Sequence, residues 1–315
     1  MAVALVFPGQ GSQDVGMGKE LAQTFKAARE VFDEVDAALG QRLSQIMWEG
    51  PKDALTLTEN AQPALMAVSM AVIRVLEHEH GYSLKNKVKF VAGHSLGEYS
   101  ALAAAGAFSL ADAARLLKTR GQAMQKAVPV GHGAMAALLG VGVDVARKVA
   151  EEAAQGEVCQ VANDNEPTQV VLSGHKAAIE RVAEVGKKHG VRRALPLPVS
   201  APFHCALMQP AAEAMAVALA KVDVKMPDVP VVANVLAAPI SDPAEIRRRL
   251  IEQVTATVRW RECVVTMADR GVTDFYEIGS GRVLAGLVKR ILKDAGAMSV
   301  GVPAEIAAAM VALSR

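Results

Sequence analysis

The chain has 315 residues, of which 51% are hydrophobic and 4% aromatic, so it can fill a sizeable core and suits helices packed on a sheet better than an all-β fold. Lys and Arg total 34 against 33 for Asp and Glu, which gives no overall charge for binding nucleic acid or an anionic membrane. The cysteines are widely spaced and include no C-x-x-C pair, which argues against a disulfide framework or a zinc site: Cys159, Cys205 and Cys263. We therefore expect a reducing, cytoplasmic setting. We also expect that the protein uses neither a metal nor another cofactor.

The N-terminal segment predicts a strand, a glycine-rich loop and a helix. Residues 2–7 are a continuous apolar run, which we interpret as a strand rather than a signal peptide, and residues 8–13 form the loop. One helix is expected to follow, with apolar positions at Leu21, Phe25, Ala28, Phe32 and Val35. A dinucleotide-binding G-x-G-x-x-G is rejected because position 14 is Asp14. The loop still offers backbone N–H groups at the carboxyl end of a strand, where open α/β sheets bind ligands.

The most informative turn is Gly93-His94-Ser95-Leu96-Gly97, which lies between a predicted strand over 87–92 and an alanine-rich helix over 97–105. Glycine two positions either side of a serine allows the sharp reversal of a nucleophile elbow. The serine hydroxyl then lies beside the unpaired N–H groups of the new helix, where an oxyanion could bind. The alternative interpretation is a glycine-rich turn with an incidental serine.

Helices are also predicted on both sides of this turn, over 63–79 and over 110–125. Ser109 and Asp112 form a capping box for the second helix. Arg120 lies on its apolar stripe, with leucine, alanine and methionine at helical spacing around it. A guanidinium there either extends to the surface, pairs with an internal carboxylate, or awaits an anionic ligand, and periodicity leaves these three options open.

Residues 129–198 predict an inserted subdomain. The expected order is strand, helix, strand, strand, helix, strand, which is typical of a ferredoxin-like unit, and loops rich in Gly and Pro bracket it. The remainder, residues 1–128 and 199–315, continues with alternating strands and helices, including a helix that begins after Asp242 and runs to Gln253. We therefore predict an α/β protein whose large domain has a mostly parallel sheet covered on both faces, with an α/β-hydrolase-like organisation.

A serine nucleophile needs a base, and His204 is the best placed of the seven histidines. It follows the small subdomain on a loop that returns to the large one, although a structural role is equally open from spacing alone. His94 adjoins the serine, but neighbouring residues at an elbow point in different directions, so we expect it to support the site rather than react. The adjacent Cys205 is poor evidence for a Cys–His pair, because such pairs are brought together by the fold.

Four segments in this order resemble the malonyl-CoA:acyl carrier protein transacylases. They are residues 7–13 (FPGQGSQ), 93–99 (GHSLGEY), 119–125 (TRGQAMQ) and 201–204 (APFH), and the resemblance extends over essentially the whole chain. It implies transfer of a malonyl group from malonyl-CoA to the phosphopantetheine thiol of an acyl carrier protein, through a malonyl-serine intermediate, for fatty acid synthesis.

The resemblance also implies residue roles. Ser95 is then the nucleophile, His204 its acid and base, and Arg120 the ligand of the malonyl carboxylate. The backbone N–H groups of Gln10 and Leu96 would form the oxyanion hole. The remaining assignments concern the acyl pocket and the histidine: Met124 and Phe203 would line the pocket, and Gln253 would orient His204.

Two other functions remain as alternatives, namely an acyltransferase of a polyketide pathway and a serine esterase or thioesterase. A hydrolase would normally place an acidic residue behind the histidine, and no Asp or Glu is marked by its position for that role. An acidic carrier protein would favour a basic docking surface, although basic runs can also be simply solvated faces. Two runs are candidates: Lys187, Lys188, Arg192 and Arg193, and separately Lys289, Arg290 and Lys293.

Overall fold

A computed structural model describes residues 2–199 and 201–313. Its larger part contains a mostly parallel sheet, as predicted. The strand order is β10-β9-β1-β2-β7-β8, and only the β7–β8 pair in this described sheet is antiparallel. The strand bounds are β1 (Val3–Phe7), β2 (Val88–Gly93), β7 (Val231–Ala233), β8 (Ala238–Ile240), β9 (Asp274–Ile278) and β10 (Gly296–Val300).

The central strand β1 is buried on both faces, as a continuous apolar run in a parallel sheet requires. Val3, Leu5 and Phe7 face one hydrophobic core, and Ala4 and Val6 face the other. This alternation follows from the two-residue period of a strand. Helices therefore cover both faces of the sheet, chiefly α5 (Thr58–His80), α7 (Gly97–Ala104) and α8 (Leu110–Ala127) on one face, and α13 (Trp260–Asp269) and α14 (Val283–Ile291) on the other.

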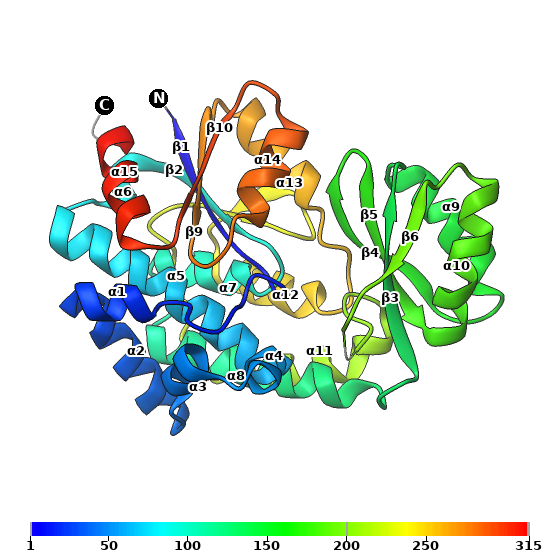
Figure 1. Cartoon of the computed structure of the whole chain (residues 1–315), viewed down its shortest axis with the longest axis horizontal. Coiled ribbons are helices and arrows are strands. Elements are labelled where there is room, and N and C mark those ends of the chain that lie inside the picture. The colour runs from blue at the N-terminus through cyan, green and yellow to red at the C-terminus, as the bar shows by residue number, and fades with distance from the viewer. Residues whose placement is uncertain (1, 200, 314–315) are drawn as a thin grey trace.

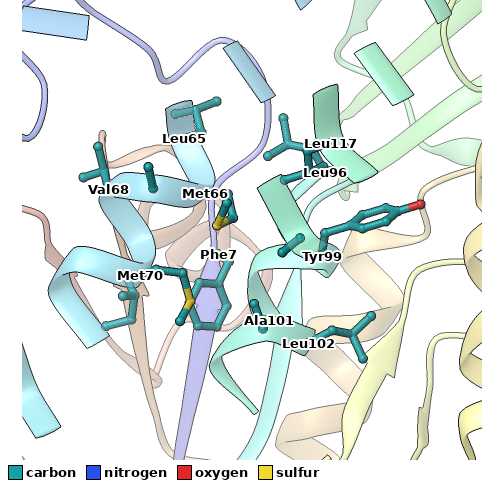
Figure 2. Packing of buried hydrophobic residues seen from close by; sticks show 14 of the residues in the cluster. Phe7, Leu65, Met66, Val68, Met70, Leu96, Tyr99, Ala101, Leu102 and Leu117 are labelled. Carbon is teal, nitrogen blue, oxygen red and sulfur yellow. The ribbon is translucent and has the colours of Figure 1, made fainter. Parts of the chain in front are cut away.

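The first of these cores holds the short helix α7 in place. Figure 2 shows Phe7 of β1 beside Met70 of α5, with Ala101 and Leu102 of α7 close by. Residues 97–103 are all buried, although the helix is short, because small side chains let it lie directly against the sheet. The start of α7, which follows Ser95 by two residues, is thus anchored by packing rather than by helix propensity.

The smaller part has its own antiparallel sheet with the strand order β4-β5-β3-β6, and Figure 1 shows α9 and α10 along one side of it. Its elements follow the predicted order: β3 (Gly133–Leu139), α9 (Val143–Ala154), β4 (Cys159–Glu166), β5 (Gln169–His175), α10 (Lys176–Lys188) and β6 (Arg193–Pro196). The buried faces of both helices and one face of the sheet form a separate hydrophobic core.

A hydrogen-bonded junction joins this sheet to the larger part. The backbone of Val258 exchanges hydrogen bonds with Ala162 and Asp164 of β4, both of 2.9 Å. Arg261 of α13 donates to both carboxylate oxygens of Asp164, which is 1% exposed. A bidentate ion pair of this kind restricts the orientation of the two side chains as well as the distance between them, so β4 is held firmly against α13.

Several predicted bounds were wrong. The helix expected over residues 21–35 is two helices, α1 (Lys19–Thr24) and α2 (Lys26–Leu39), because Phe25 adopts an extended conformation between them. The helix expected at residue 63 begins at Thr58 and includes Pro63 in its second turn. The sequence analysis did not identify α3 (Leu43–Glu49), α4 (Lys52–Thr56), α6 (Leu84–Lys87), β8, β10 or α15 (Pro303–Leu313). These are short, edge or C-terminal elements with weak periodicity.

The loop that follows the small part leads through the 3-10 turn Ala206–Met208 into α11 (Gln209–Leu219), and α12 (Pro243–Gln253) begins at the predicted cap, Asp242. No helix within the described residues combines the length and apolarity needed to cross a bilayer.

Because α7 lies so close to β1, a methyl group added at Gly97 should lower the stability of the fold. In Gly97→Ala the new Cβ would lie 2.2 Å from the carbonyl oxygen of Phe7, and we expect the free energy of unfolding to fall by about 2–3 kcal/mol in urea titrations. Gly286→Ala in α14 is the matched control, because the nearest atom to its Cβ would be the end of a flexible arginine 3.5 Å away. That change should be neutral or stabilising by about 0.5–1 kcal/mol. Equal stability of the two variants would contradict the steric argument.

Candidate active site

Ser95 lies at the turn between β2 and α7 in a left-handed conformation, with φ 55°. The reversal is so tight that a Cβ on Gly93 would lie 1.8 Å from the backbone carbon of Gly97. The Ser95 N–H donates to Asn234 Oδ1 at 2.8 Å, and its carbonyl oxygen accepts from Gln253 Nε2 at 3.0 Å. Backbone strain of this kind persists only where the surroundings hold it, and it is common at reactive positions.

A cleft of about 450 Å³ opens over Ser95 between the two parts of the chain. Met135 and Asn163 from the small sheet contribute to its wall. Almost every residue nominated from the sequence lines it, namely Gln10, His94, Ser95, Leu96, Arg120, Met124, Phe203 and His204. Gln253 is fully buried behind the cleft and contacts Arg120 and His204.

His204 is hydrogen-bonded to the serine. Its Nε2 lies 2.7 Å from Ser95 Oγ, and its Nδ1 lies 2.9 Å from the backbone carbonyl oxygen of Gln253. Because a carbonyl only accepts, Nδ1 carries the hydrogen and the unprotonated Nε2 faces the serine hydroxyl. Burial, followed by the positive charge of Arg120, lowers the pKa of His204 to about 3. The imidazole is therefore neutral at pH 7 and able to accept a proton from Ser95.

Arg120 is 1% exposed, which rules out the option that it extends to the surface. It donates to neutral oxygens, namely Gln62 Oε1 at 2.9 Å, Gln253 Oε1 at 2.8 Å and Ser95 Oγ at 3.2 Å, and its guanidinium lies 5.7 Å from the ring centre of Tyr99. None of the carboxylates in the described residues forms an ion pair with it. Burial lowers the pKa of Arg120. A buried cation without an acid in contact is suited to bind an anion that enters the cleft.

Gln253 connects the base to this arginine. Its backbone carbonyl holds His204, its side-chain Oε1 accepts from Arg120, and its Nε2 donates to Glu98 Oε2 at 2.8 Å. The backbone N–H of Asn234 donates to the same Glu98 oxygen at 3.1 Å. The contact with His204 is made by the main chain, so the side-chain amide of Gln253 serves Arg120 and Glu98 instead.

The sequence analysis missed Gln62, Glu98 and Asn234. A usable signal existed for Glu98, which is a charged residue among alanines on the helix that follows the elbow. It also existed for Gln62, which is a polar residue within the apolar stretch 61–68. Asn234 gives no comparable signal, because only the parallel pairing of β2 with β7 brings it behind Ser95.

The two N–H groups nominated for the oxyanion hole are available. Leu96 immediately precedes α7, and Gln10 lies in the turn after β1. Among the described residues neither backbone N–H has an intramolecular acceptor. The Gln10 side chain donates to Thr58 Oγ1 at 3.3 Å, which restrains the loop. Gln10 and Leu96 both line the same cleft as Ser95.

The remaining nominated residues have identifiable contacts. His94 Nε2 lies 2.8 Å from Asn165 Oδ1 of β4, and burial lowers the pKa of His94, so this ring is a neutral contact between the two parts of the chain. Met124 receives a hydrogen bond from Gln62 Nε2 at its sulfur, at 3.7 Å. Phe203 is 8% exposed and forms part of the cleft wall next to His204.

The lowered pKa of His204 predicts a dependence of stability on pH. Between about pH 6.5 and 3, His204 binds a proton in the unfolded chain but not in the folded chain. The contribution of His204 to the free energy of unfolding is therefore complete above pH 6.5 and is lost as the pH falls. From pH 7.5 to 5, the free energy of unfolding should fall by about 2 kcal/mol more in the unsubstituted chain than in His204→Gln. Urea titrations at both pH values measure this difference, and parallel losses in the two proteins would contradict it.

The chain is similar to known proteins over nearly its whole length. The acyl transferase domain family matches residues 4–310. The malonyl CoA-acyl carrier protein transacylase of Escherichia coli (strain K12) is 47% identical over 307 residues, covering 98% of each chain. The acyl-carrier-protein-S-malonyltransferase structure from Bartonella henselae is 56% identical with a TM-score of 0.97, covering 100% of each chain. A malonyl-transacylase solved in complex with a type II PKS acyl-carrier protein is 42% identical with a TM-score of 0.95, covering 99% of this chain and 100% of that one. The chain therefore belongs to the acyl transferase domain family and, within it, to the malonyl CoA-acyl carrier protein transacylases.

Proposed function

We propose that Ser95, His204 and Arg120 carry out the reaction of this acyltransferase, which transfers malonyl from malonyl-CoA to the phosphopantetheine thiol of acyl carrier protein and so supplies fatty acid synthesis. The observation that supports this most directly is Arg120, a buried guanidinium with neutral partners 3.2 Å from the Ser95 hydroxyl. A malonyl thioester that reaches Ser95 presents its free carboxylate to that guanidinium, and an acetyl thioester has none to present.

Acylation follows from the hydrogen bonds around Ser95. His204 Nε2 takes the hydroxyl proton as Ser95 Oγ bonds to the thioester carbonyl carbon, and the N–H groups of Gln10 and Leu96 stabilise the oxyanion. The intermediate collapses by breaking the carbon–sulfur bond, and His204 returns the proton to the departing coenzyme A thiol. Binding of the malonyl carboxylate also offsets the positive charge of Arg120, which makes His204 more basic when the correct substrate is present.

Deacylation repeats these steps with the pantetheine thiol as nucleophile. The thiol gives its proton to His204, its sulfur bonds to the ester carbonyl carbon, and Ser95 leaves and is reprotonated. The malonyl-serine ester thus separates two half-reactions, which is ping-pong kinetics. Met124 and Phe203 line the cleft and would form the acyl pocket, and the resemblance to the family associates a phenylalanine at position 203 with malonyl rather than branched acyl groups.

The same proposal extends to the architecture and setting. The large part, residues 1–128 and 199–315, is α/β-hydrolase-like, and residues 129–198 are a ferredoxin-like insertion, which the antiparallel order β4-β5-β3-β6 supports. Residues 1, 200, 314 and 315 lie outside the described residues. We assign the enzyme to the cytoplasm. We also assign it a reaction that uses neither metal nor cofactor, since the serine, the base and the two N–H donors account for each step.

Intact-protein mass spectrometry with malonyl-CoA and acetyl-CoA tests the nucleophile and the carboxylate ligand. We expect a malonyl adduct on the unsubstituted chain and none on Ser95→Ala. In Arg120→Ala the rate of malonylation should fall by an amount equivalent to about 2–5 kcal/mol, with acetylation equalling or exceeding it. The adduct should persist in water and be discharged by pantetheine thiols. Rapid release of free malonate would instead identify a hydrolase.

Charge reversal tests where the acidic carrier protein docks. Lys289 and Arg290 lie in the last turn of α14 and, like Lys293, are exposed and form no ion pair among the described residues. In the other basic run only Lys188 is ion-paired among the described residues, with Glu152 at 3.1 Å. Lys289→Glu with Arg290→Glu should therefore raise the KM for carrier protein several-fold and leave that for malonyl-CoA unchanged. Lys187→Glu with Arg192→Glu is the comparison. An equal rise in both KM values would refute docking at α14.

A further inference from the structure

Arg120 has no carboxylate in direct contact among the described residues, but the carboxylate of Glu98 lies on the far side of the Gln253 side chain. The amide of Gln253 lies between them: its Oε1 accepts from Arg120 Nη2 at 2.8 Å, and its Nε2 donates to Glu98 Oε2 at 2.8 Å. An amide has a carbonyl end that attracts cations and an N–H₂ end that attracts anions. The two charges therefore fix its orientation, and the amide transmits part of their attraction.

The site of Glu98 is as enclosed as that of Arg120. Glu98 is 1% exposed in the first turn of α7, and it accepts hydrogen bonds from Gln253 and from the backbone N–H of Asn234. None of the cations in the described residues forms an ion pair with it. A buried carboxylate without a cation in contact is costly unless it balances a nearby charge.

We propose that the Glu98 carboxylate is a positioning residue which balances the charge of Arg120 through the Gln253 amide while the acyl site is empty, and that the malonyl carboxylate takes over this role on binding. The inference rests on the proposed function of Arg120. In the empty site Glu98 holds the guanidinium between Gln62 and Gln253, ready for the substrate. Once malonyl is bound, Glu98 becomes a second negative charge near the same cation and limits how tightly malonyl-CoA binds.

Near neutral pH, Glu98 is the group that changes charge, while the titratable groups around it keep theirs. Burial raises the pKa of Glu98 to about 7, and the charge of Arg120 from α8 partly opposes this. Tyr99 on the same helix and Cys263 from α13 have pKa values raised by burial, so both remain neutral. His204 has a pKa of about 3 and is neutral as well. Between pH 6 and 8 the carboxyl of Glu98 changes from mostly neutral to mostly charged.

Glu98→Gln tests the charge and keeps the shape. The new side chain still offers an oxygen to Gln253 and Asn234, while the negative charge is lost and an N–H₂ group replaces the second oxygen. In a Ser95→Ala background, which prevents turnover, we expect calorimetry at pH 8 to show malonyl-CoA binding roughly tenfold tighter when Glu98→Gln is added, with acetyl-CoA binding unchanged. The gain should vanish at pH 6, because Glu98 in the parent is then mostly protonated.

Glu277→Gln is the matched control. Glu277 of β9 is fully buried, accepts from the backbone N–H of Ala285 at 2.8 Å and also has a pKa raised by burial. Its substitution should leave the malonyl-CoA affinity of the Ser95→Ala background unchanged at both pH values. If Glu98→Gln does not fold, the parent itself remains a test: its affinity for malonyl-CoA, but not for acetyl-CoA, should rise as the pH falls from 8 to 6.

The outcomes separate this inference from the function on which it rests. Unchanged or weaker malonyl-CoA binding in Glu98→Gln, an effect shared by acetyl-CoA, or an effect shared by Glu277→Gln would overturn the role of Glu98. Adding Arg120→Ala to the Ser95→Ala background should abolish the preference for malonyl-CoA over acetyl-CoA. A preference that survives without Arg120 would overturn the proposed function of Arg120, whereas one that depends on Arg120 and not on Glu98 overturns only the inference.

Discussion

The approach of the elbow to the first strand constrains everything else in this enzyme. The backbone at Gly97 contacts the carbonyl of Phe7 so closely that a Cβ would lie 2.2 Å from the oxygen, and Gly93 is equally crowded against Gly97. The chain can make this turn only with Ser95 in a left-handed conformation, which directs its hydroxyl into the cleft. Packing of α7 against the first hydrophobic core maintains the strain, so the rigidity of the nucleophile comes from the fold and not from its own side chain.

The polar groups behind the elbow act as one unit because Gln253 belongs to several contacts at once. Its main chain sets the tautomer of His204, and its side chain lies between Arg120 and Glu98. Ser95, His204 and Arg120 are therefore positioned by shared hydrogen bonds, and a displacement of one affects the others. Under the proposed function, selectivity for a dicarboxylic acyl group and activation of the serine would both depend on this buried network, since a substrate carboxylate at Arg120 would change the field at His204.

Both parts of the chain are needed to enclose the reaction. Asn163 of β4 lines the cleft, and its neighbour Asp164 is fixed to α13 by the bidentate bond from Arg261. His94 adds a second link through Asn165. The cleft wall contributed by the small sheet is therefore held to the larger part by charged and polar contacts.

Much of this could be predicted from the sequence, because the relevant signals are local. The apolar run of β1, the glycines at 93 and 97, the cap at Ser109 and the alternation of strands and helices each reflect steric or hydrogen-bonding rules within a few residues. The strand order, the start of α5 at Thr58 and the break at Phe25 were decided by packing between distant segments, which overrides local propensity. The same holds for the site. Ser95 and His204 were recognisable as candidates, but the sequence left open whether Arg120 reached the surface, paired with an acid or awaited an anion. Only the tertiary structure excluded the first two options, because burial, the distance to Ser95 and the amide between Arg120 and Glu98 arise from residues that lie on separate elements.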